Sequence, residues 1–161
     1  MIDSIDRDIL AIIRQNARVS NVEIARKIGM APSAILERLR KLEAKGVIEG
    51  YEAKISAKSL GLGLLAFIFV RADDRIGELG TGQALADIPE VLEVHHITGE
   101  DCFLVKVRTS DTESLGRLLR ERFGAIPTIR STRTTIVMNS VKETSLLPLE
   151  LSVGANVNDS R

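Results

Sequence analysis

The chain has 161 residues, of which 44% are hydrophobic and 3% aromatic with no tryptophan, so we expect one medium or two small domains with aliphatic cores. Its formal net charge is zero, but residues 1–60 carry +3 and residues 61–161 carry −3, which suits a local phosphate-contacting surface better than a general polyanion binder. One cysteine excludes an intrachain disulfide framework, and the absence of a leader and of any apolar run near the roughly 20 residues of a membrane span predicts a cytoplasmic protein.

A first helix is predicted close to the N-terminus. Asp3 is a good N-cap, and Asp6 lies in the first turn, where a negative charge is favourable. The spacing of the isoleucines places four of them on one stripe: Ile5, Ile9, Ile12 and Ile13. We expect this stripe to cover the apolar backs of the two helices that follow.

The stretch 20–46 predicts two short helices joined by a tight turn. Ser20 and Glu23 have the spacing of a capping box, Gly29 ends the first helix, and Pro32 lies in the first turn of the second. The second helix has an apolar face formed by Ile35, Leu36, Leu39 and Leu42. Its other face is polar and basic. This is the arrangement of a helix-turn-helix, which places its second helix in the major groove of DNA.

Charge supports DNA binding less strongly than helix spacing does. From Arg18 to Lys45 there are seven basic residues and three acidic ones, a local net charge of +4. Charged helix faces are common, however, in proteins that bind no nucleic acid. We expect the DNA contacts at the start of the first helix of the motif and on the outer face of the second, at Ser20, Asn21, Ser33, Ala34, Glu37, Arg38 and Lys41.

Two of these residues have a second interpretation. Glu37 lies four residues before Lys41, which favours a helix-surface ion pair over a base contact. The stem of Arg38 could cover the edge of the core, although its place on the second helix favours a DNA contact.

The segment after the helices contains the expected domain boundary. Residues 47–55 are β-prone and predict a strand or ribbon that forms a wing or a connector. The small residues and glycines that follow are typical of a linker. We therefore expect a DNA-binding domain at 1–55, a linker at 56–62, a second domain at 63–142 and a tail at 143–161.

The second domain begins with a strand that is apolar on both faces. Residues 62–70 carry aliphatic or aromatic side chains at nearly every position, so both faces need cover. A domain of this size supplies one layer of helices. We infer that the other face packs against another subunit.

The remaining pattern completes an α+β protein. Helices are expected at about 77–88 and 112–125, and strands at about 91–98, 103–109 and 129–138. The order strand, helix, strand, strand, helix, strand is that of a ferredoxin-like βαββαβ sandwich. A polar turn, TGED at 98–101, joins its two middle strands.

The histidines and the cysteine do not predict a metal site, a cofactor or a catalytic centre. His95 and His96 are adjacent in a predicted strand, so they point to opposite faces and cannot chelate one ion as a local pair. Cys102 is interpreted as a small buried hydrophobe.

The residues and their order resemble the Lrp/AsnC (feast/famine) family of bacterial and archaeal transcription regulators. The matching stretches are IDRDIL from residue 5, RVSNVEIA from 18, LERLRKLE from 36, GVIEGY from 46, TGE from 98 and TRTTIVM from 132. The resemblance covers roughly residues 2–142. It implies a (winged) helix-turn-helix domain, an effector-binding domain that forms dimers through its sheet and often octamers, and an amino acid bound between neighbouring dimers.

The resemblance also implies where the effector binds. The residues concerned are Gly99, Glu100, Asp101, Thr134 and Ile136, with Thr134 supplied by a neighbouring chain. Many relatives have Asp where this chain has Glu100, and a second Asp where it has Cys102. Glu100 keeps the charge that an α-amino group needs. Glu100 and Asp101 could instead be turn residues only.

Two other functions share parts of this pattern. Siroheme decarboxylases have the same two-domain architecture. After the helix-turn-helix, however, they carry a basic Arg-Arg-Ile-Gly pattern, whereas this chain has Glu49-Gly50-Tyr51. A stand-alone amino-acid sensor would need a degenerate DNA-binding domain, and the motif here is intact. We therefore expect a non-enzymatic regulator that binds double-stranded operator DNA and an amino-acid-type effector.

Overall fold

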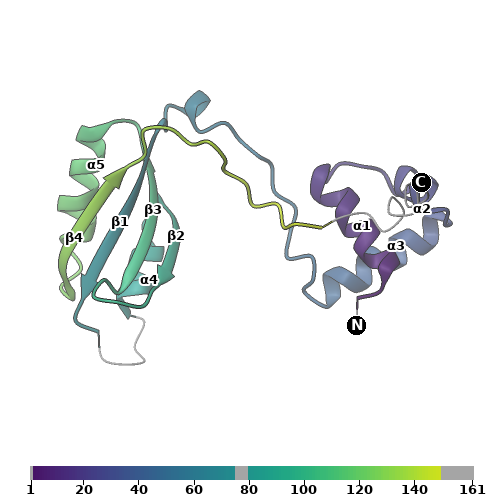
Figure 1. The fold of residues 1–161 in the computed structure, drawn as a ribbon, viewed down its shortest axis with the longest axis horizontal. Coiled ribbons are helices and arrows are strands. Elements are labelled where there is room, and N and C mark those ends of the chain that lie inside the picture. The colour runs from purple at the N-terminus through teal and green to yellow at the C-terminus, as the bar shows by residue number, and fades with distance from the viewer. Residues whose placement is uncertain (1, 75–79, 150–161) are drawn as a thin grey trace, which may run out of the picture. The chain divides into compact units, whose positions relative to one another are not determined.

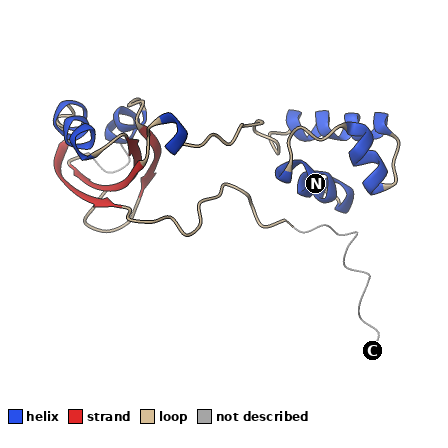
Figure 2. Cartoon of the chain, turned by 90° about the horizontal axis from the view of Figure 1, so that it is seen from above, coloured by secondary structure: helices blue, strands red, loops and turns tan. Residues whose placement is uncertain are grey.

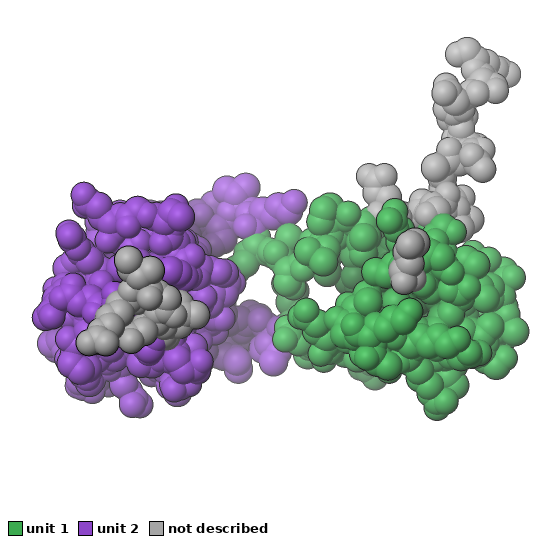
Figure 3. Space-filling model, turned by 90° about the horizontal axis from the view of Figure 1, so that it is seen from below, with its two compact units in different colours: residues 1–54, 143–161 green, residues 55–142 purple. Residues whose placement is uncertain are grey.

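The computed structural model describes residues 2–74 and 80–149 (Figure 1). The chain divides into two units, each with its own hydrophobic core (Figure 3). The first contains residues 2–54 together with 143–149 of the tail, and the second contains residues 55–142. Within the described ranges, no helix combines the length and the apolar character that crossing a membrane requires.

The first unit is built from three helices that begin at the expected caps. They are α1 (Ser4–Gln15), α2 (Asn21–Ile28) and α3 (Pro32–Ala44). Asp3 caps α1 in a capping box with Asp6, and Ser20 caps α2 in a second box with Glu23. Gly29 adopts the left-handed conformation (φ 79°) that ends α2, a conformation that glycine adopts without strain. The predicted helix-turn-helix is confirmed.

The core of this unit is aliphatic, as expected. It is formed by Ile9, Ile12, Ile24, Ala25, Ile35 and Leu39. Leu36 was expected on the same face, and that expectation is wrong because 39% of its surface is exposed. One residue of α-helix turns the side chain by about 100°, so the neighbour of the buried Ile35 points away from the core.

The segment after α3 is not a strand. Gly46 (φ 67°) closes the helix, and the amide of Val47 donates to the carbonyl of Leu42 at 2.9 Å. Farther on, the Tyr51 hydroxyl donates to Glu43 Oε1 at 2.8 Å. The strand expected over 47–55 is therefore wrong for the described chain. A strand needs a neighbour to take its N–H and C=O groups, and the described part of this unit has no strand to offer.

The second unit is the expected ferredoxin-like sandwich. Its elements are β1 (Leu64–Ala72), α4 (Gly80–Ala86), β2 (Val91–His96), β3 (Phe103–Thr109), α5 (Thr112–Leu118) with a π-helical turn (Leu119–Phe123), and β4 (Ile129–Ile136). The antiparallel strands lie in the order β2-β3-β1-β4. A short 3-10 turn (Lys58–Leu60) precedes β1. The start expected for α4 at 77 lies outside the described residues.

Both helices cover the same face of the sheet (Figure 2). Ala66, Ile68 and Val70 of β1 point towards them and are fully buried. The alternate residues Phe67 and Phe69 lie on the opposite face and are half-buried. No helix of the described chain covers that face, which we call the bare sheet face. That a second subunit covers it stays a prediction.

Candidate DNA-binding surface and effector loop

Glu37 and Lys41 on α3 are paired with each other. Lys41 Nζ lies 2.7 Å from Glu37 Oε1, and both side chains are about two-thirds exposed (65% and 68%). The hydrogen bond from Lys41 lowers the pKa of the Glu37 carboxyl. This confirms the predicted i,i+4 ion pair. Because water screens it, the pair contributes little to stability and can open to make other contacts.

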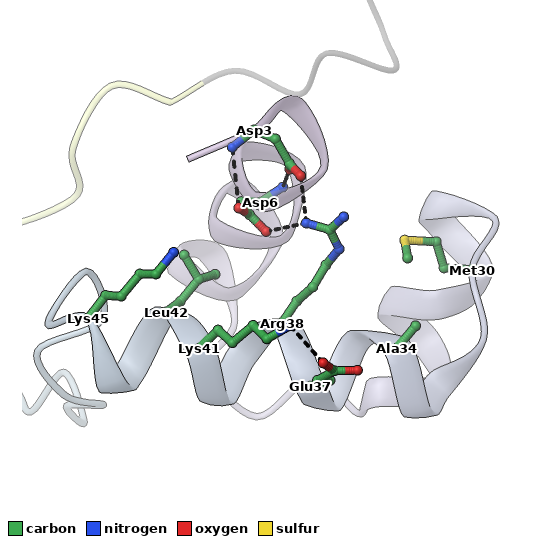
Figure 4. A pocket seen from close by; sticks show the side chains of 9 residues that line it. All are labelled: Asp3, Asp6, Met30, Ala34, Glu37, Arg38, Lys41, Leu42 and Lys45. Atoms are coloured by element: carbon green, nitrogen blue, oxygen red, sulfur yellow. Dashed lines mark hydrogen bonds and ion pairs between the residues drawn. The ribbon is translucent and has the colours of Figure 1, made fainter. Parts of the chain in front are cut away.

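Arg38 is turned towards α1 (Figure 4). Its Nη1 lies 2.7 Å from Asp3 Oδ2 and 2.7 Å from Asp6 Oδ1, and its side chain is only 28% exposed. The hydrogen bonds to Asp3 and then to Asp6 raise the pKa of the Arg38 guanidinium. This ion-pair cluster forms part of the wall of a cavity of about 420 Å³. The other residues that line it are Met30, Ala34, Glu37, Lys41, Leu42 and Lys45. Arg38 thus joins α3 to the start of α1.

One exposed stripe of α3, which we call the outer stripe, runs through Ser33, Leu36, Glu37 and Arg40, with the exposed Lys41 beside it. The four stripe positions follow the spacing i, i+3, i+4, i+7, which is the spacing of the base-contacting residues on homeodomain recognition helices. Sequence reasoning named Ser33 and Glu37 as DNA contacts and placed Arg40 on the polar face without naming it as a contact, whereas it placed Leu36 on the apolar face. The helical period from Ser33 also passes through Leu36 and Arg40.

At the start of α2, fewer side-chain groups are free to contact DNA than the sequence predicted. The Ser20 hydroxyl accepts from the Glu23 amide at 3.2 Å and donates to Glu23 Oε2 at 3.0 Å. Asn21 is half-buried, as is Ala34 on α3. The Ser20 side chain therefore serves the helix cap in this structure.

The loop between β2 and β3 presents a carboxylate on a tight turn. Gly99 has φ 116°, a conformation that side chains disfavour, and Glu100 beside it is exposed. Among the contacts of the described residues, none engages the Glu100 carboxylate. Asp101 is 31% exposed and accepts from Arg133 Nη2 at 3.1 Å.

The two candidate residues on β4 lie away from this loop. Thr134 pairs with Ile68 and Ile136 pairs with Ala66, whereas the amide of Cys102 at the end of the loop donates to Val70 at 2.8 Å. β1 also separates β3 from β4 in the sheet. A single chain therefore does not bring the loop together with Thr134 and Ile136. It does bring Arg133 to the loop, a contact that sequence reasoning missed.

The histidines point to opposite faces, as predicted. His95 lies 3.3 Å from Glu93 on the bare sheet face, while the His96 ring packs on Phe103 with centroids 5.2 Å apart. No group of three or more metal-ligating side chains occurs in the described ranges. Cys102 is half-buried rather than buried, and its thiol donates to the Ala72 carbonyl at 3.3 Å.

Two family matches account for both units. Residues 2–49 match the family described as winged helix-turn-helix DNA-binding, and residues 65–147 match the Lrp/AsnC ligand binding domain. The chain belongs to the Lrp/AsnC family. Similar Lrp/AsnC proteins include the leucine-responsive regulatory protein of Escherichia coli, which is 34% identical over 153 residues, with 92% of each chain covered.

Other Lrp/AsnC relatives agree in length and fold. An HTH-type transcriptional regulator of Pyrococcus horikoshii is 37% identical over 150 residues, covering 92% of this chain and 97% of that protein. A crystal structure of a Neisseria meningitidis transcriptional regulator in complex with L-Met superposes with a TM-score of 0.86 at 28% identity, covering 92% and 97% of the two chains. The protein is therefore an effector-modulated, DNA-binding transcription regulator.

Proposed function

We propose that this regulator binds a free amino acid at the loop 99–101 and that binding changes its operator affinity or its oligomeric state. The observation that carries the proposal is that a carboxylate and a guanidinium are both present at this loop, the first from the loop and the second from β4. Glu100 offers an exposed carboxylate for an ammonium group, and the guanidinium of Arg133 on β4 reaches the loop at Asp101. The L-Met complex of the Neisseria relative supports the choice of ligand class.

Neighbouring chains complete the site in this proposal. Thr134 and Ile136 lie too far along β4 to meet the loop of their own chain, so they act on the loop of another. The bare sheet face supplies the dimer contact, and the dimers assemble further, as far as an octamer. A ligand held between dimers shifts assembly because its affinity differs between the associated and dissociated states.

For the DNA surface we propose direct contacts by the outer stripe of α3, with Lys41 and the start of α2 contacting the backbone. Arg38 acts as a positioning residue. Its guanidinium is held by two carboxylates of α1, so it fixes the angle at which α3 is presented. This differs from the base or phosphate contact expected for Arg38 from its sequence position.

Removal of the loop carboxylates tests the effector site. Glu100→Ala and Asp101→Ala, alone or together, should abolish the effector's influence on operator binding or oligomer size and leave effector-free DNA binding nearly intact. A thermal-shift screen of the twenty amino acids identifies the ligand, since a ligand of the native state stabilises it by mass action. Calorimetry and sedimentation then compare wild type with the variants.

Glu113→Ala is the matched control, because Glu113 is an exposed carboxylate on α5 that lies outside the loop (85% exposed). It should respond to the effector as wild type does. Wild-type affinity in both loop variants would show that the loop is only a turn.

Salt dependence separates the proposed backbone contact, Lys41, from the positioning residue, Arg38. Removing one side chain that neutralises a DNA phosphate should reduce the slope of log affinity against log salt by about 0.9. We expect Lys41→Ala, which removes a proposed backbone contact, to reduce the slope, and Arg38→Ala to weaken binding with the slope unchanged. A reduced slope in Arg38→Ala would instead place that guanidinium on a phosphate.

We also propose that the protein acts without catalysing a reaction. The relatives compared above are named as regulators, and the segment around Gly50 lacks the basic pattern of siroheme decarboxylases. Addition of siroheme should therefore give the absorption spectrum of the free tetrapyrrole. A shifted spectrum would favour the enzyme.

A further inference from the structure

Leu36 is a partly exposed apolar side chain among the polar residues on the outer surface of α3. Across this fully described helix it is the one large apolar side chain with substantial exposure, at 39%. The core beneath is already closed by Ile35 and Leu39, which are 0% and 8% exposed. Leu36 therefore lies at the edge of the core and presents part of its apolar surface to solvent.

The neighbours of Leu36 are polar and belong to the outer stripe. Ser33 precedes it by three residues, Glu37 follows it directly, and Arg40 lies one turn beyond. Glu37 is engaged with Lys41 at 2.7 Å. In the proposed function this stripe faces the bases, where an aliphatic side chain gains only from an apolar partner in the groove.

The major groove offers one apolar group, the C5-methyl of thymine. We propose that Leu36 packs against a thymine methyl in each operator half-site and so selects thymine at that position. This inference rests on the proposed function, in which α3 reads the major groove. It adds a specificity-determining residue and the chemical feature of the operator that this residue recognises.

The expected energy is modest and measurable. Burying one methyl group contributes about 0.8 kcal/mol, equivalent to a roughly fourfold change in affinity per half-site. Leucine has no hydrogen-bonding group, so the preference depends on the methyl alone. Deoxyuridine is the direct probe, because it keeps every polar group of thymidine and lacks only this methyl.

The experiment uses the full-length protein and a duplex that it enriches from a random-sequence pool. Each thymine is replaced singly by deoxyuridine, in both half-sites together, and affinity is measured at fixed salt. We expect affinity to fall by about fourfold per half-site at one thymine position. Leu36→Ala should bind the thymine and uracil forms of that duplex equally. Leu60→Ala, at a leucine of similar character outside α3 (63% exposed), should keep the wild-type difference.

Three results would overturn the inference. If replacing thymine with uracil changes the affinity at no position, the protein does not recognise a thymine methyl group. A full uracil penalty retained in Leu36→Ala would assign the methyl to another side chain, and the wild-type uracil scan is informative even if that variant folds poorly. Failure of wild type to enrich any duplex would reject operator reading itself, and with it the proposed function, whereas the first two results reject Leu36 alone.

Discussion

At the scale of single residues, the start of α1 combines two tasks in the same pair of carboxylates. Asp3 accepts from the Asp6 amide at 2.7 Å as a helix cap, and both side chains also hold Arg38. The cap and the contact between α1 and α3 therefore depend on the same charges. Neutralising those charges should weaken both together.

Acid should destabilise the first unit for this reason. The Asp6 amide and then Arg38 lower the pKa of Asp3 from its ordinary value of 3.8. A carboxyl whose folded pKa is depressed contributes stability above its unfolded pKa, and this contribution is lost as pH falls through the folded value. In urea unfolding experiments, the free energy of unfolding should thus decrease as the pH falls below 3.8.

Asp3→Asn removes the titrating group and should reduce the pH dependence of the free energy of unfolding. The measurement is the free energy of unfolding at a series of pH values for both proteins. Parallel curves for wild type and variant would show that Asp3 adds no pH-dependent stability.

At the scale of elements, local chemistry predicted most of the fold. The capping boxes at Asp3 and Ser20 and the apolar run along β1 are short-range signals, and the elements they predicted are present. The strand predicted at 47–55 is absent, because residues with high β-propensity form a strand only where a neighbouring strand can pair with them. For an isolated segment, composition cannot show whether such a partner exists.

The candidate sites were less predictable because their contacts join distant parts of the chain. Arg38 meets Asp6 across 32 residues, and Arg133 meets Asp101 across another 32. No periodicity links such pairs. Glu37 and Lys41, one turn apart on a single helix, were predictable from spacing alone.

The packing of α4 on β3 gives a prediction with an internal control. A Cβ added to Gly82 would lie 2.8 Å from Phe103 Cε1, and both residues are buried, whereas a Cβ at Gly80 meets nothing within 4 Å. Gly82→Ala should destabilise the second unit by roughly 1–3 kcal/mol through overpacking.

Gly80→Ala should be neutral or stabilising, by up to about 1 kcal/mol, because alanine favours helix. Urea unfolding of the two variants beside wild type decides the matter. Equal stability of both variants would show that Phe103 moves aside without cost.

At the scale of the whole molecule, the bare sheet face combines apolar and charged groups. Phe67 and Phe69 lie along its centre, with Arg133 above the Phe69 ring at 4.0 Å. Lys106 donates to Glu93 at 2.9 Å on the same face, which lowers the pKa of the Glu93 carboxyl. An apolar centre with a paired polar surround is typical of a specific protein interface.

A charge at the centre of this face should prevent association. Phe67→Glu would bury a carboxylate beside the Lys106–Glu93 pair in the proposed dimer, with a desolvation cost of about 3 kcal/mol or more. Sedimentation should then show dissociation at concentrations where wild type is associated. Leu60→Glu, at an exposed leucine outside the sheet, should sediment as wild type does. A Phe67→Glu protein that remains associated would place the subunit contact on another surface.

The hydrogen bond from Tyr51 to Glu43 has a practical consequence for spectroscopy. The chain contains one tyrosine and no tryptophan, so its intrinsic emission comes from this single ring, which is anchored to the last turn of α3. Burial, followed by the Glu43 carboxylate, raises the pKa of Tyr51 to about 12. The unlabelled protein thus carries its own optical reporter at the end of α3, and alkaline titration can be followed there without any engineered probe.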